Sequence, residues 1–141
     1  MTEEKSLRGK KSRAAGARFE TKVRAHLEEI GWTVCKWMNT VDYEKNSLAP
    51  AKRKFNPFFK VLGMGVGFPD FVCFKRRAKN KDSFEVIGLE VKANGYIDQK
   101  EKGMCLWLIE HKIFSRILIA KKGKKRGEIE YIDFEKKYTS Q

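Results

Sequence analysis

Asp70, Glu90 and Lys92 are the residues of this chain whose types and spacing could do chemistry at a metal ion. Glu90 and Lys92 are one residue apart, so on a strand their side chains point to one face and that of Val91 to the other. Two carboxylates suit a hard divalent cation such as Mg²⁺, which takes few protein oxygens and keeps several waters. A lysine beside it can hold a phosphate or make an attacking water more acidic. The three residues therefore predict a metal site with hydrolytic chemistry.

Two strands must bring these residues together. The apolar run Phe71–Phe74 predicts a buried strand, and Phe84–Lys92, rich in β-forming residues, predicts a second. The charged spacer Lys75–Ser83 suits a connection between neighbouring antiparallel strands. In such a pair the start of the first strand lies beside the end of the second. The two carboxylates and the lysine are therefore expected to converge at one end of a two-stranded ribbon.

The motif Pro69–Asp70, followed after 19 residues by Glu90–Lys92, resembles that of the PD-(D/E)xK nuclease superfamily. Within it, the chain is most similar to the archaeal-type Holliday junction resolvases and related stand-alone endonucleases, over roughly residues 14–134. The resemblance implies an α/β (α+β) fold with a restriction-endonuclease-like core, a central mixed sheet flanked by helices in the order α-β-β-β-α-β-β. It also implies hydrolysis of DNA phosphodiester bonds with Mg²⁺ or Mn²⁺, selective for branched DNA in recombination or repair.

The resemblance assigns a role to each motif residue. Asp70 and Glu90 would hold the metal, with the Val91 carbonyl as a further ligand. Lys92 would orient or activate the attacking water and stabilise the developing negative charge.

Two residues outside the motif are implicated by the same resemblance. Glu20, in the first predicted helix, matches a glutamate that reaches the metal site, often through water. Gln99, near the start of a later helix, matches a glutamine that positions the substrate or a metal-bound water. The alternatives are a surface glutamate favoured by the helix dipole and a solvated glutamine.

Helical and strand periodicity places the flanking elements. The first helix is expected from Gly16 to about Ile30, with a core face at helical spacing formed by Phe19, Val23, Leu27 and Ile30. A strand over 32–37 follows, and a second helix runs from Gln99 to His111 with Asp98 as its N-cap. A strand over 114–120, expected inside the sheet because of its apolar run, and an edge strand over 128–134 complete the single domain 14–141.

The formal net charge of +13 over 141 residues points to a polyanionic partner, for which nucleic acid is the commonest choice. The alternative is a basic surface that serves solubility. Residues 1–13 carry basic side chains and almost nothing apolar, which predicts a flexible basic arm. The expected DNA-contacting residues are Lys10, Lys11, Arg13, Lys52, Arg53, Lys54, Phe55, Lys60 and Lys102.

The stretch 38–67 is unusually long for a connection between strands. It interleaves basic and aromatic residues, which suits phosphate contacts and stacking on distorted bases. A loop whose Phe58 and Phe59 pack into the core explains it equally well.

The three cysteines, Cys35, Cys73 and Cys105, form no CxxC motif and predict buried, reduced thiols in a cytoplasmic, DNA-associated protein. No apolar run predicts a membrane span, and no motif predicts a small-molecule cofactor. A resolvase that cuts two strands symmetrically would require a two-fold dimer, and the sequence leaves the oligomeric state open. An RNA-processing nuclease and a non-catalytic DNA-binding protein with a nuclease-like fold remain alternatives.

Overall fold

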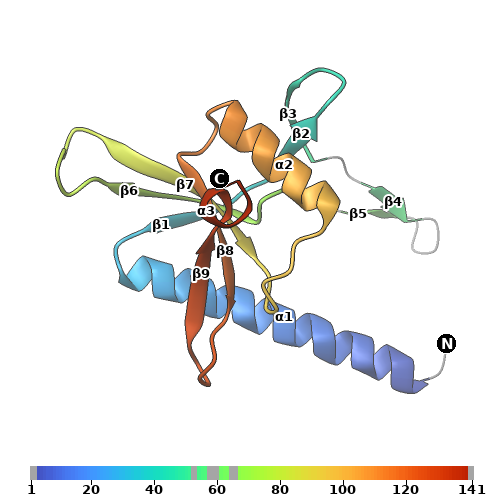
Figure 1. Cartoon of the computed structure of the whole chain (residues 1–141). Helices are drawn as coiled ribbons and strands as arrows, with labels where there is room; N and C mark the ends of the chain where they lie inside the picture. Colours follow the sequence, from blue (N-terminus) through green and yellow to red (C-terminus); the bar gives the residue numbers. More distant parts are fainter. Residues whose placement is uncertain (1–2, 52–53, 57–60, 64–66, 140–141) are drawn as a thin grey trace.

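A mixed five-stranded sheet lies at the centre of an α+β fold (Figure 1). The structure is a computed structural model that describes residues 3–51, 54–56, 61–63 and 67–139, and the side chains of 9–51 and 67–139. The elements are α1 Glu3–Glu29, β1 Thr33–Lys36, β2 Asn39–Asp42, β3 Ser47–Pro50, β4 Lys54–Asn56, β5 Val61–Gly63, β6 Phe71–Arg76, β7 Phe84–Val91, α2 Gln99–Glu110, β8 Arg116–Lys122, β9 Ile129–Asp133 and α3 Phe134–Tyr138.

The strand order in the sheet is β1-β6-β7-β8-β9. β6 and β7 pair antiparallel with Phe71 opposite Leu89, as the sequence predicted for this ribbon. β7 and β8 are parallel, and α2 forms the crossover that such a pair requires. The internal position of β8 and the edge position of β9 are also confirmed. The short helix α3, capped by Asp133, was not predicted.

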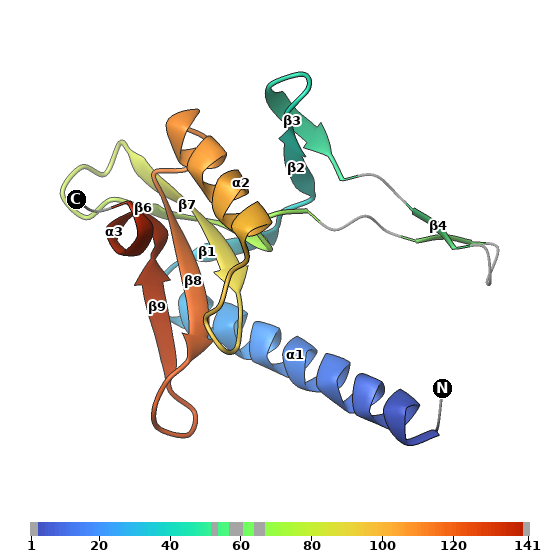
Figure 2. The same cartoon turned by 45° about the vertical axis from the view of Figure 1, so that its right-hand side comes forward.

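Two apolar cores cover the two faces of the sheet, and strand alternation divides the residues between them. The helices α1 and α2 that cover these cores lie on either side of the sheet (Figure 2). On β8, Leu118 and Ala120 face the core under α1, whereas Ile117 and Ile119 face the core under α2 and α3. α1 contributes Phe19, Val23 and Leu27 to the first core. Its expected fourth core residue, Ile30, is 48% exposed, because it follows the last helical turn.

The start of α1 differs from the prediction. The helix begins at Glu3 and not at Gly16, so from Glu3 onward the expected flexible arm is part of α1. Lys, Arg, Glu and Ala dominate this segment and are all strong helix formers, which sustain a helix without a buried face. The scarcity of apolar residues therefore did not indicate a lack of helix.

The connection 38–67 contains two hairpins where an irregular loop was expected. β2 pairs antiparallel with β3, and β4 with β5. Asn46, in the turn after β2, has a φ of 51°, a conformation that asparagine tolerates. Its side-chain oxygen accepts a hydrogen bond from Trp107 Nε1 at 2.9 Å, which attaches the first hairpin to α2. The expected phosphate contacts Lys52, Arg53 and Lys60, and also Phe58 and Phe59, lie outside the described residues.

Gly67 lies against the backbone of the segment that leaves β1. A Cβ atom at this position would lie 2.3 Å from the Trp37 carbonyl oxygen and 2.9 Å from the Asn39 nitrogen. Gly67→Ala is therefore expected to destabilise the protein by about 1–3 kcal/mol, because backbone atoms cannot move aside cheaply. Urea unfolding measures this loss.

Gly16→Ala is the matched control for that substitution. Nothing lies within 4 Å of a Cβ atom at Gly16, and alanine is favoured over glycine inside a helix by about 1 kcal/mol. The control should therefore be neutral or stabilising. A Gly67→Ala protein as stable as the Gly16→Ala protein would contradict the close approach.

The three cysteines are free, and two of them are buried. Burial raises the pKa of both Cys73 and Cys105 to about 12, which keeps them as thiols. Cys35 is exposed on edge strand β1, so the expectation of three buried thiols is wrong at this position. Within the described residues no helix is both long and apolar enough to cross a membrane.

Candidate functional site

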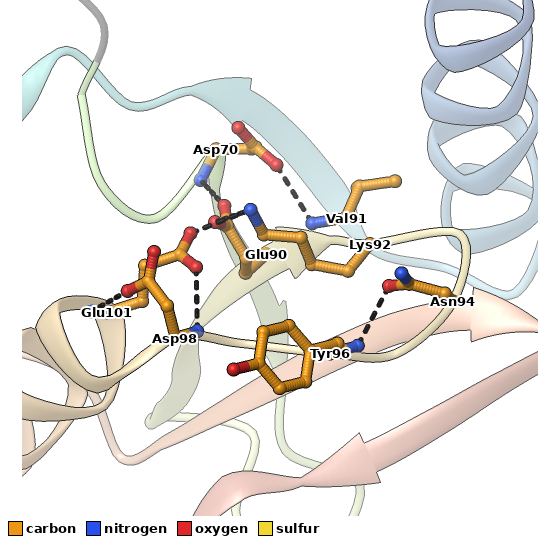
Figure 3. Close-up of polar contacts among 8 residues, drawn as sticks. All are labelled: Asp70, Glu90, Val91, Lys92, Asn94, Tyr96, Asp98 and Glu101. Carbon is orange, nitrogen blue, oxygen red and sulfur yellow. Dashed lines mark hydrogen bonds and ion pairs between the residues drawn. The ribbon is translucent and has the colours of Figure 1, made fainter.

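Asp70 and Glu90 meet where the start of β6 lies beside the end of β7 (Figure 3). The Asp70 backbone N–H donates to Glu90 Oε1 at 3.2 Å. In return, Asp70 Oδ2 accepts a hydrogen bond of 2.8 Å from the Val91 N–H. These reciprocal bonds fix both carboxylates against backbone amides of the paired strands, so the predicted convergence of the two acids is confirmed.

Glu90 is buried, with 4% of its surface exposed, and it is the one acidic or basic residue that is buried among the described side chains. Burial and the neighbouring Asp70 carboxylate raise its pKa from 4.5 to about 10, because both disfavour a second negative charge. In the absence of a cation, the pair therefore holds a proton at neutral pH. Either that proton or a bound cation can relieve the repulsion.

Lys92 lies on the same face as Glu90, as strand alternation predicted. Its Nζ atom is 3.8 Å from Glu90 Oε2 and 2.7 Å from Glu101 Oε2. Burial alone would lower the pKa of Lys92, but the hydrogen bond to Glu101 and the surrounding carboxylates raise it above 10.5. The side chain is therefore a fixed positive charge beside the two acids.

Glu101 is the site residue that the sequence reasoning missed. Asp98 caps α2 by accepting from the Glu101 N–H, and Glu101 Oε1 accepts from the Asp98 N–H in a capping box. The other carboxylate oxygen of Glu101 holds Lys92. The signal was present in the sequence, because a glutamate three residues after the predicted N-cap Asp98 marks a side chain that folds back toward the preceding strand.

Glu20 lies at the edge of this site. Its Oε1 atom accepts from Lys36 Nζ at 3.0 Å, and Lys36 is the β1 partner of Phe71, the residue after Asp70. Over the described side chains, no three carboxylate, histidine or cysteine groups come close enough to hold a metal together. The structure therefore places Glu20 near the Asp70 strand but does not bring it together with Asp70 and Glu90.

The remaining predicted residues lie around the site or away from it. Gln99 is the first residue of α2 and is exposed. Lys102 points to α3, with its Nζ atom 4.9 Å from the centre of the Tyr138 ring. Three expected DNA contacts, Lys10, Lys11 and Arg13, are exposed on α1. For Lys54 and Phe55 the structure describes the backbone of β4 and not the side chains.

The donor set of the site fits a hard divalent cation. Two carboxylates at adjacent strand ends supply the oxygen ligands that Mg²⁺ or Mn²⁺ prefers, and Mg²⁺ needs only one or two of them when substrate phosphates and waters complete its shell. The buried carboxylate pair would also gain from a cation that neutralises its charge. The nearby ammonium of Lys92 suits a phosphate oxygen and no metal.

Glu90→Gln is expected to stabilise the metal-free protein at pH 8 and to leave its stability near pH 4.5 almost unchanged. Because the pKa of Glu90 is higher in the folded state, the folded protein binds more protons between pH 4.5 and about 10. Its free energy of unfolding therefore falls as the pH rises through this window. Glutamine is neutral without taking up a proton on folding, so the variant should gain on the order of 1–3 kcal/mol at pH 8.

Urea unfolding in the presence of a chelator, at both pH values, measures this gain. Glu85→Gln on the same strand is the control, because Glu85 is ion-paired with Arg116 at 2.6 Å and its loss should not stabilise the protein. An equal pH dependence of wild type and Glu90→Gln would contradict the protonated pair.

Comparisons of the chain with protein-family models, with curated proteins and with solved structures find no match. Function is therefore inferred from the geometry of the site. That geometry combines two carboxylates with one fixed positive charge at the end of a sheet, a combination suited to a divalent cation and an anionic, phosphate-bearing substrate.

Proposed function

We propose that this protein is a metal-dependent endonuclease that hydrolyses DNA phosphodiester bonds at a site of the PD-(D/E)xK type. The single observation that supports it best is the convergence of Asp70, Glu90 and Lys92 at the β6–β7 end, with Glu90 buried. A protein that only binds DNA has no need of converging carboxylates, which repel phosphate. The restriction-endonuclease-like core belongs to the same proposal, supported by the order of α1, β1, β6, β7, α2, β8 and β9.

In this mechanism Asp70 and Glu90 would hold an Mg²⁺ or Mn²⁺ ion, with the Val91 carbonyl as a further ligand. When bound, such an ion would make a bound water more acidic and would neutralise charge on the phosphate. Lys92 donates to a phosphate oxygen and stabilises the negative charge that develops during hydrolysis. Glu101 keeps the Lys92 ammonium in place through the 2.7 Å contact, and its capping bond to Asp98 fixes its own carboxylate.

Glu20 and Gln99 have outer roles in the proposal. Glu20 holds Lys36 beside the start of β6, and Gln99 lies at the exposed entry of α2 where it can meet substrate. Branched DNA is the proposed substrate, on the strength of the motif resemblance, and paired cuts would require a two-fold dimer.

Cleavage assays on matched substrates test the proposal. A closed circular duplex, a four-way DNA junction and an RNA junction of the same sequence are incubated with Mg²⁺ or with a chelator. Nicking of the circle that requires metal establishes an endonuclease, because the circle has no ends. Paired nicks on the DNA junction would establish a resolvase, and cleavage of RNA alone would replace it with an RNA-processing nuclease. No metal-dependent cleavage of any substrate would sink the proposal.

A further inference from the structure

A basic cleft of about 400 Å³ lies between α1 and the turn that joins β8 to β9. Arg18, Phe19 and Lys22 line one wall, and residues 122–128 line the other. Figures 1 and 2 show this turn beside α1. The walls approach closely, since a Cβ atom on Gly127 would lie 3.5 Å from Lys22 Nζ. The cleft is therefore a product of two segments that are distant in sequence.

Positive charge dominates the cleft. Its six basic side chains are Arg18, Lys22, Lys122, Lys124, Lys125 and Arg126, against the single acid Glu128. Glu128 is used by the turn itself, where Oε2 accepts from the Lys125 N–H at 3.4 Å. Across the described side chains, none of the six forms an ion pair, whereas neighbouring Lys121 pairs with Glu130 at 3.6 Å. Uncompensated cations held this close repel one another, and a bound anion would relieve that repulsion.

The cleft and the candidate metal site share one end of the sheet. β7 and β8 run parallel with Val91 opposite Ala120, so both strands end on the same side. The Lys122 N–H donates to the Ala93 carbonyl at 3.0 Å, which joins the cleft wall to the segment that follows Lys92. The cleft lies on the α1 face and Glu90 on the α2 face, so an extended anion would pass round the ends of these strands to reach Asp70 and Glu90.

On α1, the basic residues of the cleft continue beyond it as a stripe that is longer than a small anion needs. Lys11, Arg18 and Lys22 are spaced by seven and four residues on α1, so they lie on one helical face. At 1.5 Å per residue this stripe is roughly 16 Å long, which matches several consecutive phosphates of one strand. Phe19 supplies an apolar floor, with Lys122 Nζ 5.8 Å from its ring centre.

We propose that this cleft binds the phosphate backbone of a nucleic-acid strand, independently of its base sequence. The inference rests on the proposed function for the identity of that strand, which would be a part of the nuclease substrate next to the cut site. It assigns binding to the α1 face and the β8–β9 turn, and leaves the chemistry to the β6–β7 end.

The test uses the full chain carrying Asp70→Asn, which is not expected to cut, and a short fluorescent DNA duplex. Lys22→Ala with Arg126→Ala is expected to weaken binding at least tenfold at low salt and to reduce the log–log salt slope by about two units. Lys79→Ala with Lys81→Ala removes the same charge from the exposed β6–β7 turn at the other end of β7 and should change affinity less than threefold. The charge-conserving pair Lys22→Arg with Arg126→Lys should bind nearly as wild type.

Equal losses of DNA affinity in the cleft and control variants would overturn the inference. Displacement of the DNA by polyglutamate of equal charge at equal concentration would also overturn it, because it would indicate an acidic protein partner. Unchanged affinity in the cleft variant, with metal-dependent cleavage by the wild type, would refute the cleft and leave the nuclease standing. Lost DNA affinity in the cleft variant, with no cleavage of any substrate by the wild type, would support the cleft and refute the nuclease.

Discussion

Asp70→Asn is expected to reduce Mg²⁺-dependent cleavage of DNA about a thousandfold or more. The substitution removes one of the two carboxylates that would hold the cation, whose charge stabilisation is worth several kcal/mol in the transition state. The fold should survive, because the asparagine oxygen can still accept the hydrogen bond from the Val91 N–H. DNA affinity should be unchanged or higher, since a charge that repels phosphate is lost. Single-turnover cleavage and fluorescence anisotropy measure the two effects.

Asp42→Asn is the matched control for Asp70→Asn. Asp42 is a carboxylate at a strand end that also accepts a backbone N–H, from Lys45 at 3.1 Å, but it lies on the β2–β3 hairpin. The Asp42→Asn variant should cleave DNA at the wild-type rate. Mg²⁺ should raise the melting temperature of the wild type and of Asp42→Asn but not of Asp70→Asn, because ligand binding stabilises only a protein that binds it. An Asp70→Asn enzyme that cuts at the wild-type rate would remove Asp70 from the site.

Lys92→Met is expected to slow cleavage by roughly a hundredfold or more, the scale of losing one preorganised group that stabilises transition-state charge. Methionine retains an apolar stem of similar length, so the packing of the half-buried side chain is largely kept. Binding should change little, because one of 31 basic residues is lost. The ratio of single-turnover rate to DNA affinity separates the chemical effect from simple electrostatic attraction.

Lys121→Met is the control for charge loss at this end of the sheet. Both lysines are 33% exposed and both are ion-paired, but Lys121 pairs with Glu130 on β9 and not with the site. Its loss should leave the rate within a few-fold. Lys92→Arg should recover little activity, because a planar guanidinium does not replace a compact ammonium between Glu90 and Glu101. Full activity of Lys92→Arg would indicate phosphate clamping by charge alone, and full activity of Lys92→Met would exclude Lys92 from the mechanism.

Local periodicity in the sequence was enough to predict the ribbon that carries the site. Side chains alternate along any strand, so Glu90 and Lys92 had to share a face once β7 formed, and an antiparallel β6 had to bring Asp70 beside them. The Asp98 cap of α2 and the buried residues Phe19, Val23 and Leu27 on α1 follow equally from local chemistry and helical spacing. These features depend on residues close together in the chain.

The predictions from sequence failed where a local pattern of residue types does not determine the local structure. Polar helix formers hid the beginning of α1, because they sustain a helix without the apolar periodicity by which a helix is recognised in sequence. The connection 38–67 was expected to be a loop, yet it forms hairpins; Pro50 ends β3, at the margin of the first hairpin, where a missing N–H is tolerated. Cys35 was expected inside, yet its strand lies at the edge of the sheet.

Contacts between segments far apart in the chain were decided by the tertiary structure alone. Packing of α2 over the sheet face that carries Glu90 and Lys92 brings Glu101 onto Lys92, and makes Glu90 a buried acid rather than an exposed one. The same is true of the basic cleft, since the β8–β9 turn meets α1 only because β8 follows β7 in parallel and ends beside that helix. Periodicity determines which way a side chain points within its own element, whereas its partners depend on how the elements pack.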